Sequence, residues 1–156
     1  MNRHSTLFDA ATIAARVNEL AAEIDAAYAD IERPLLMVGV LRGSFVFLAD
    51  LVRAMKTPTE IDFLAASSYG DERESSGAVR LVTDLREDIA GRDVLLVEDI
   101  VDTGRTLKAL TELLQQRAPK SLRLVSLLDK PSRRVASVEA DFCGFTIEDL
   151  YVIGYG

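Results

Sequence analysis

The sequence has a single cysteine, Cys143, and a single histidine, His4. A lone cysteine excludes an intrachain disulfide and a thiolate zinc cluster, and it agrees with a reducing compartment. No apolar run approaches the ~18 residues of a membrane-spanning helix, so we expect no integral membrane protein. The N-terminal segment carries Asp9 where a secretory signal needs its apolar stretch, so the expected location is the cytoplasm.

Basic residues are also few. The 18 lysines and arginines stand against 25 acidic residues, for a net charge of -7, with no dense basic cluster beyond Arg133 and Arg134. This disfavours non-specific binding of nucleic acid. It does not exclude an anionic small molecule, because backbone amides, one or two basic side chains and a divalent cation can outweigh the average field locally.

The chain has 156 residues, of which 49% are hydrophobic and 28% charged, as in a water-soluble globule. This length predicts one domain over residues 1–156. Between residues 9 and 30, apolar residues recur in steps of three and four. That spacing predicts an amphipathic helix, capped by Asp9 and stopped by Pro34.

Two short, fully apolar stretches, 35–41 and 94–97, are typical of strands that are covered on both faces. Helical spacing returns after Gly43 and again from Thr103, where the pattern ends before Pro119. The polar segment 68–78 predicts a mobile loop. Further strands are expected at residues 60–67, 79–83, 122–128 and 151–153. Strands that alternate with helices predict an α/β fold with a mainly parallel sheet between helices.

An acidic pair, Glu98 and Asp99, follows the apolar strand 94–97. Ligands bind at the carboxyl ends of strands in open α/β sheets, so the pair lies where a site is expected. Two ionised carboxylates about 4 Å apart repel by roughly 4 kcal/mol at an effective dielectric constant of 20. Hydroxyl donors or a metal would offset this repulsion, so a sugar or Mg²⁺ fits the pair.

The turn after this pair suits a phosphate group. Thr103, Gly104, Arg105 and Thr106 offer two hydroxyls and the backbone amides of a helix N-terminus. The Walker loop's lysine and glycine spacing is missing, as is Gly-x-Gly-x-x-Gly, so a 5′-monophosphate is favoured over a nucleoside triphosphate or a dinucleotide. Spacing alone also allows Thr103 to be only a helix cap, and the acids to be a solvated strand end.

The run Glu98-Asp99-Ile-Val-Asp102-Thr103-Gly104-Arg105-Thr106 resembles the phosphoribosyl-pyrophosphate (PRPP) signature of type I phosphoribosyltransferases, specifically their hypoxanthine-guanine branch. Motifs at 41–44, 67–70, 128–131, 141–145 and 152–156 appear in that family's order, so the resemblance covers roughly residues 10–156. It implies the type I phosphoribosyltransferase fold, a central, mainly parallel sheet flanked by helices, with a small hood formed from the chain ends. It also implies a purine salvage transferase that is dependent on Mg²⁺ and converts hypoxanthine or guanine and PRPP to IMP or GMP and pyrophosphate.

The resemblance assigns the PRPP-binding residues. By this comparison Glu98 and Asp99 hold the ribose hydroxyls and the magnesium shell, while 103–106 cradle the 5′-phosphate. Asp102 lies beside N7 of the purine as the general acid/base. The pyrophosphate loop consists of Leu41, Arg42 and Gly43, and its Leu41-Arg42 peptide is expected to be cis.

The resemblance also assigns the purine pocket and a lid. Lys130 donates to O6 of a 6-oxopurine and would reject a 6-amino group, which sets a donor against the ammonium. Tyr151 stacks on the base, and the backbone of Val152 reads its edge. Ser68 and Tyr69 belong to a flexible lid over PRPP. Without the resemblance, each of these residues has a simpler interpretation. Asp102 would be an aspartate at the start of a helix, and Arg42 and Lys130 would be surface side chains. Tyr151 would be a core tyrosine, and the lid a plain surface loop.

The pattern departs from the family at Gly156, where relatives continue with an aspartate for magnesium and an arginine for pyrophosphate. Either the sequence is truncated or both groups are missing, and their absence would weaken metal binding and turnover. The family also implies a homodimer or homotetramer, with no nucleic-acid or membrane partner. The sequence does not rank hypoxanthine, guanine and xanthine.

Two other functions compete with catalysis. A PRPP-sensing regulator on the same fold, such as the RNA-binding attenuators of pyrimidine operons, carries an uncharged residue at the position of Asp102. The acid at this position, the low basic content and Lys130 favour the enzyme. A phospho-accepting receiver domain also ends a strand in paired acids, but its pair comes early in the chain, unlike Glu98 and Asp99.

Overall fold

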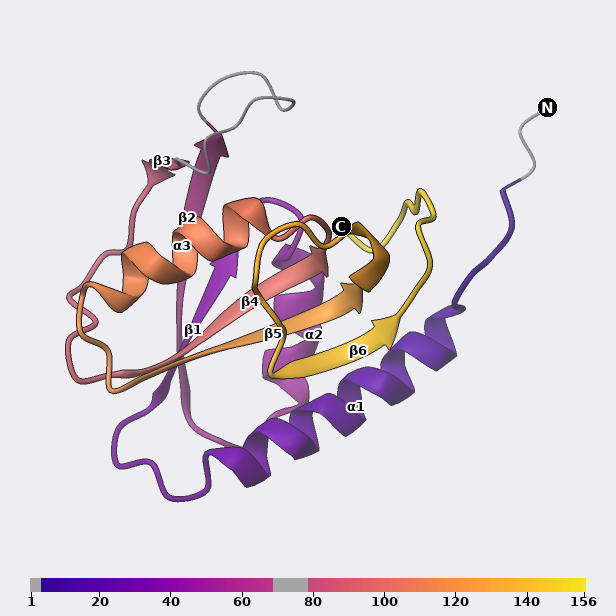
Figure 1. Ribbon diagram of the computed structural model, residues 1–156. Helices are drawn as coiled ribbons and strands as arrows, with labels where there is room; N and C mark the ends of the chain where they lie inside the picture. The colour runs from indigo at the N-terminus through magenta and orange to yellow at the C-terminus, as the bar shows by residue number, and fades with distance from the viewer. Residues whose placement is uncertain (1–3, 69–78) are drawn as a thin grey trace.

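The computed structural model describes residues 4–68 and 79–156. Within them, six strands form one sheet in the order β3-β2-β1-β4-β5-β6 (Figure 1). The strands are β1 (Leu35–Val40), β2 (Thr59–Ser68), β3 (Val79–Thr83), β4 (Asp93–Val101), β5 (Ser121–Asp129) and β6 (Phe142–Thr146). The helices are α1 (Ala10–Ala27), α2 (Phe45–Ala54), α3 (Arg105–Gln115) and the short 3-10 helix η1 (Pro131–Arg133).

The sheet is mainly parallel, as predicted. β1 pairs in parallel with β2 and β4, β4 with β5, and β5 with β6, whereas β3 alone runs antiparallel to β2. The central strands β1 and β4 are apolar at successive positions because both of their faces are covered. Parallel strands joined by helical crossovers require this double cover. The predicted α/β class is therefore confirmed.

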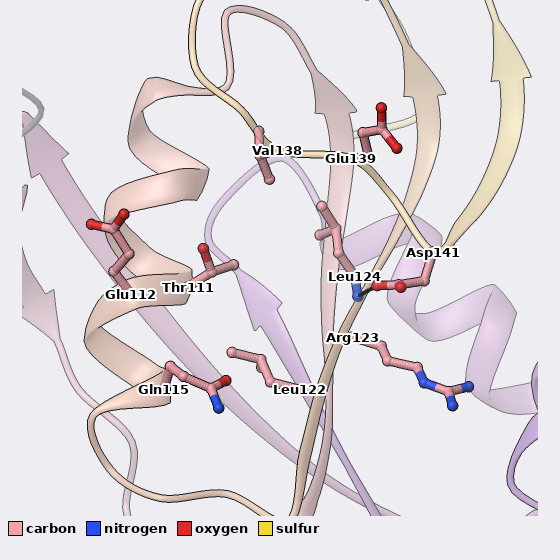
Figure 2. Close-up of a pocket in the computed structure, with 9 residues that line it drawn as sticks. All are labelled: Thr111, Glu112, Gln115, Leu122, Arg123, Leu124, Val138, Glu139 and Asp141. Atoms are coloured by element: carbon pink, nitrogen blue, oxygen red, sulfur yellow. Dashed lines mark hydrogen bonds between the residues drawn. The ribbon is translucent and has the colours of Figure 1, made fainter.

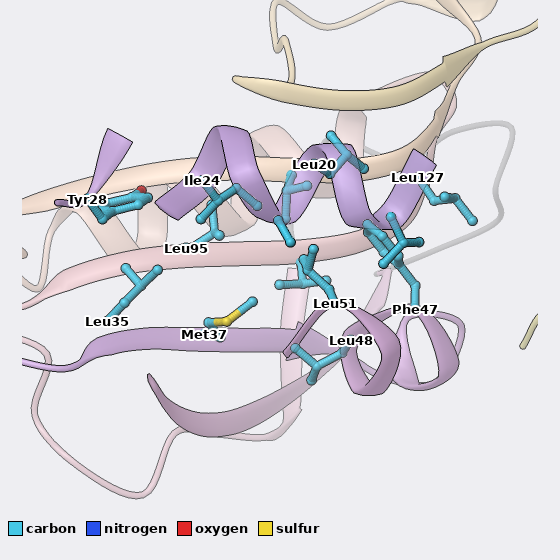
Figure 3. Close-up of a cluster of buried hydrophobic side chains, with 14 residues drawn as sticks. Leu20, Ile24, Tyr28, Leu35, Met37, Phe47, Leu48, Leu51, Leu95 and Leu127 are labelled. Atoms are coloured by element: carbon cyan, nitrogen blue, oxygen red, sulfur yellow. The ribbon is translucent and has the colours of Figure 1, made fainter. Parts of the chain in front are cut away.

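Two hydrophobic cores lie on opposite faces of the sheet. Helices α1 and α2 cover one face, where they pack on Met37 and Leu95, and this cluster is drawn in Figure 3. Helix α3 covers the other face and packs on Val38 and Leu96. Neighbouring strand residues thus serve opposite cores, because successive side chains of a strand point to opposite faces.

Helix α1 begins as predicted at its cap. The Asp9 carboxylate accepts a hydrogen bond from the Thr12 amide at 2.8 Å. Val17, Leu20 and Ile24 form its buried face. The helix nevertheless ends at Ala27, well before Pro34, so the prediction that proline stops it is wrong. The last helical hydrogen bond is donated by the Tyr28 amide to the Ile24 carbonyl at 3.0 Å.

Two strand predictions need correction. Strand β4 continues to Val101, so the acidic pair lies within the strand and not beyond its end. Residues 151–153 form no strand. No strand among the described residues pairs with them, and the chain leaves the extended conformation directly afterwards, with φ of 95° at Gly154 and 61° at Tyr155. The last strand is instead β6, whose weakly apolar sequence takes its structure from pairing with β5.

The N-terminal part of the chain contacts strand β6. The Phe8 ring stacks on Phe145 with 4.0 Å between ring centroids. The Arg16 guanidinium donates to the carbonyl groups of Cys143 at 2.7 Å and Gly144 at 2.8 Å. Helix α1 and the residues before it are therefore bound to the last strand of the sheet. Among the residues that the structure describes, no helix combines the length and apolarity needed to span a bilayer.

Candidate functional site

The candidate site lies where the carboxyl ends of β1 and β4 meet. These two strands are neighbours at the middle of the sheet, with β2 beyond β1 and β5 beyond β4. The connections after β1 and β4 thus lead to opposite sides, and this reversal opens a crevice at the carboxyl ends of the strands. The segments that follow β1, β4 and β5 carry most of the predicted site residues.

The loop after β1 is held firmly by backbone contacts. Its Leu41-Arg42 peptide is cis, as predicted. The Leu41 amide donates to the Leu64 carbonyl at 2.9 Å, and the buried Ser44 hydroxyl donates to the Val40 carbonyl at 2.7 Å. The Arg42 side chain is exposed at the rim of the site. A fixed backbone with an exposed guanidinium suits an anionic ligand.

Gly43 brings this loop against the acidic pair. A Cβ at Gly43 would lie 2.8 Å from Cγ of Asp99, too close for any side chain. Glycine is therefore required here for close approach, although its backbone conformation is one that other residues adopt. The predicted pyrophosphate loop and the predicted ribose and metal ligands thus form one continuous surface.

The two neighbouring carboxylates of the acidic pair repel each other, which favours binding of a cation or a proton. Burial and the nearby Asp99 carboxylate raise the pKa of Glu98 well above its ordinary value. The Asp99 amide donates to Oε1 of Glu98 at 3.3 Å, and the Ile100 amide donates to Oδ1 of Asp99 at 2.9 Å. The interpretation of both acids as a solvated strand end is wrong, because both residues lie within β4 and are partly buried.

This donor set fits Mg²⁺ as part of a shared coordination sphere. Mg²⁺ prefers carboxylate oxygens and keeps waters or substrate phosphates as its other ligands. In the part of the chain that the structure describes, no three or more acidic, histidine or cysteine side chains group as a metal cage. Glu98 and Asp99 would therefore supply two ligands at most, and the substrate or water would supply the rest.

Asp102 lies on the turn after β4 and is half-exposed. The Arg133 guanidinium donates to Oδ1 of Asp102 at 3.0 Å. Asp102 does not open the helix, because the N-cap of α3 is Gly104, with a φ of 82°. Thr103 is not the cap either, so the interpretation of Thr103 as a simple helix cap is wrong.

Helix α3 presents backbone amides to the site. Its first internal hydrogen bond runs from the Lys108 amide to the Gly104 carbonyl at 2.9 Å. The amides of Arg105, Thr106 and Leu107 have no partner within the helix, as in any α-helix, and they point out of its N-terminus. Partial positive charge gathers at this end, so the turn can hold a phosphate group.

The predicted purine-binding residues follow β5 and β6. Lys130 is only 8% exposed, so it is not an ordinary surface lysine, and its Nζ lies 3.8 Å from Oδ1 of Asp149. Its amide donates to the Val101 carbonyl at 2.9 Å, which ties it to the end of β4. Tyr151 is 94% exposed and is not a core tyrosine. The backbone at Val152 follows directly, with its side chain half-buried.

Sequence reasoning missed several charged residues around Asp102. Arg133 lies 3.9 Å from Asp149 as well as against Asp102, and Arg134 contacts both the Asp102 carbonyl and the Asp129 carboxylate. The Arg133-Arg134 pair was visible as the densest basic cluster, but nothing in the sequence identified its partners. These partners, Asp102, Asp129 and Asp149, come close to the two arginines only in the folded structure.

Two further places lie apart from this arrangement. The expected lid residue Tyr69 lies outside the described residues, and Ser68 is described only as the backbone end of β2 opposite Val79. Figure 2 shows a groove between α3 and the segment before β6, where Asp141 accepts a hydrogen bond from the Leu124 amide at 2.8 Å. None of the predicted site residues lines that groove.

Comparisons with known proteins identify relatives of this chain. Residues 4–156 match the family described as "Phosphoribosyl transferase domain". The chain is 50% identical over 146 residues to the hypoxanthine phosphoribosyltransferase of Salmonella typhimurium, covering 94% of this chain and 82% of that one. It is 47% identical over 141 residues to the hypoxanthine-guanine phosphoribosyltransferase of Bacillus subtilis, covering 90% and 77%. A crystal structure of a hypoxanthine phosphoribosyltransferase from Staphylococcus aureus superposes with a TM-score of 0.93 at 42% identity, covering 100% of this chain and 87% of that one.

Proposed function

This chain belongs to the phosphoribosyltransferase family and is a purine salvage enzyme of its hypoxanthine-guanine branch, and we propose that three segments of the chain divide the reaction among them: 41–43, 98–106 and 130–152. The enzyme joins a 6-oxopurine to the ribose 5-phosphate of PRPP and releases pyrophosphate. The main support for this proposal is the close approach of Gly43 to the Asp99 carboxylate, because it places the proposed pyrophosphate loop next to the proposed ribose and metal site.

We propose that PRPP lies across the carboxyl ends of β1 and β4. The 5′-phosphate binds the amides and hydroxyls of 103–106 at the start of α3. The ribose hydroxyls donate to Glu98 and Asp99, and the pyrophosphate lies on the loop 41–43 beside the Arg42 guanidinium. The positions of these segments at one edge of the sheet support this proposal.

Glu98 and Asp99 would also hold Mg²⁺ together with oxygens of PRPP. When bound, this ion supplies positive charge for the leaving pyrophosphate. The raised pKa of Glu98 supports the proposal, because the pair carries more negative charge than its surroundings stabilise. Ribose hydroxyls that donate to both acids relieve the same repulsion.

We propose that Asp102 exchanges a proton with N7 of the purine as N9 forms its bond to C1 of the ribose. Lys130 donates to O6, Tyr151 stacks on the ring, and the Val152 backbone meets the base edge. The near-complete exposure of Tyr151 supports this role, because an open aromatic face is what a stacking residue needs.

The competing functions receive less support. The named relatives are transferases, which favours the enzyme over the PRPP-sensing regulator. Membership in the phosphoribosyltransferase family excludes the receiver domain. The expected homodimer or homotetramer is part of this proposal, and light scattering of the purified protein would measure it.

Steady-state assays test the proposal. Hypoxanthine, guanine, xanthine and adenine are supplied in turn with PRPP and Mg²⁺, and turnover is expected with 6-oxopurines only. The Asp102→Asn variant should lose ~10²- to 10⁴-fold in kcat, with a smaller change in PRPP affinity, because the amide cannot take up the proton. Asp30→Asn, which changes an exposed acid in the turn after α1, is the matched control. Near-normal turnover in Asp102→Asn would contradict its role.

A further inference from the structure

The turn 102–104 carries two parts of the proposed machinery, and it needs outside support. The first part is the Asp102 carboxylate, the proposed proton-transfer group. The second is the N-terminus of α3, the proposed phosphate-binding site, which begins where the turn ends. The turn has no regular secondary structure of its own, and Gly104 caps the helix without a side-chain hydrogen bond. The position of the turn must therefore come from neighbouring segments.

The segment 134–138 supplies this support from behind. The amides of Val135 and Ala136 both donate to the Thr103 carbonyl, at 2.9 Å and 3.1 Å. The missing side chain of Gly104 leaves room for the same segment, since a Cβ there would lie 3.2 Å from Cδ of Arg134. The turn is thus packed against residues that follow η1.

Arg134 links this turn to the end of β5. One guanidinium nitrogen donates to the Asp102 carbonyl at 2.7 Å, and the other donates to the Asp129 carboxylate. Both side chains are largely buried, with 17% exposed at Arg134 and 19% at Asp129. Asp129 itself is fixed, because it is paired with Val101 in the sheet and its carbonyl accepts from the Ile147 amide at 2.8 Å.

The neighbouring Arg133 differs from Arg134 in its exposure and in the group of Asp102 that it contacts. Its side chain is 46% exposed and contacts the Asp102 carboxylate, the group that we propose exchanges the proton with the base. Arg134 instead holds the backbone of Asp102 and leaves the carboxylate untouched. A planar guanidinium can make two such bonds at once in a fixed geometry, which a lysine ammonium cannot.

We propose that Arg134, held by Asp129, is a positioning residue that sets the turn 102–104 for catalysis. The proposal rests on the proposed function, because it assigns PRPP binding and proton transfer to that turn. Arg134 acts through the backbone and touches neither substrate. Its loss should therefore affect PRPP binding and kcat together, while the KM for the purine changes less.

The test compares Arg134→Lys and Asp129→Asn with Arg117→Lys. Arg117 is a suitable control because its guanidinium also donates two hydrogen bonds, at 2.8 Å and 2.9 Å, but both go to the carboxylate of Asp84, away from the site. Arg134→Lys should lower kcat/KM for PRPP by about 10-fold or more, and the double variant should be no worse than the more impaired single variant, since the pair acts as a unit. Arg117→Lys should keep the wild-type turnover.

Hydrogen exchange supplies a readout that does not depend on turnover. In Arg134→Lys, the peptide that covers 102–108 should exchange faster than in the wild type, while the peptide that covers β1 should not. Wild-type turnover in folded Arg134→Lys and Asp129→Asn, with unchanged exchange, would overturn the proposal. An inactive wild-type enzyme would instead contradict the proposed function, and the exchange result would still decide the role of Arg134.

Discussion

The Asp99 carboxyl group occupies the space in which any residue other than glycine at position 43 would place its Cβ. Two segments that are more than fifty residues apart in the sequence thus share one wall of the site. The relationship exists because β1 and β4 are hydrogen-bonded neighbours. The residue at position 43 therefore affects the position of the Asp99 carboxylate directly.

We predict that Gly43→Ala lowers kcat/KM for PRPP by about 10- to 100-fold, because the new methyl group displaces Asp99 by a fraction of an ångström or more. Gly91→Ala is the control. Gly91 has a φ of 73° and open space around its Cα, so alanine there should cost about 1 kcal/mol of stability and leave activity intact. Steady-state kinetics and urea unfolding of both variants measure this. Wild-type activity in Gly43→Ala would refute the steric argument.

Glu98→Gln should make the protein more stable and less active at pH 7. Burial and Asp99 hold the pKa of Glu98 above 4.5, its ordinary value, so ionising this carboxyl costs folding free energy as the pH rises above 4.5. We therefore expect the glutamine variant to be more stable than the wild type at pH 7, and the two to be equally stable below pH 4.5.

Urea unfolding from pH 4 to pH 8 measures this difference, with Glu32→Gln, an exposed acid, as the control. A glutamine variant that is as stable as the wild type at every pH would show that ionisation of the Glu98 carboxyl does not destabilise the fold. Activity should fall in the same variant because the ribose and Mg²⁺ lose a charged ligand.

Asp25→Ala should destabilise the protein by about 1 to 3 kcal/mol at neutral pH, because Asp25 joins α1 to the connection after α2. Its carboxylate accepts from the Lys56 amide at 2.9 Å and from the Thr57 amide and hydroxyl at 2.9 Å and 2.7 Å. Partial burial raises the pKa of Asp25, but these hydrogen bonds outweigh burial and lower it below 3.8.

The sign of the pH dependence follows from this lowered pKa. The stabilisation is complete above pH 3.8, the ordinary value, and disappears as the pH falls through the lower pKa of the folded state. Thermal unfolding of wild type and Asp25→Ala from pH 2 to pH 7 should therefore show two curves that converge only at the acid end. A constant gap across this range would contradict the assignment.

Local and periodic features of the sequence determined much of this protein. Strands such as 35–41, apolar at every position, require cover on both faces, and the spacing of Val17, Leu20 and Ile24 requires a helix with one buried side. The run 98–106 identified the family, because phosphate, ribose and proton chemistry demand particular side chains at adjacent positions. These features depend on residues that are close together in the sequence, so a local pattern is sufficient to predict them.

Only the tertiary structure decided the features that depend on distant partners. β6 is a strand because β5 pairs with it, and the apolar segment 151–153 is not one because no strand lies beside it. Glu98 has a raised pKa because of burial, and Arg134 donates a hydrogen bond to the backbone carbonyl of Asp102 because the fold brings the two together. Pairing, burial and long-range hydrogen bonds arise from contacts that no local pattern records, so the sequence predicts which groups are present and the fold decides what they face.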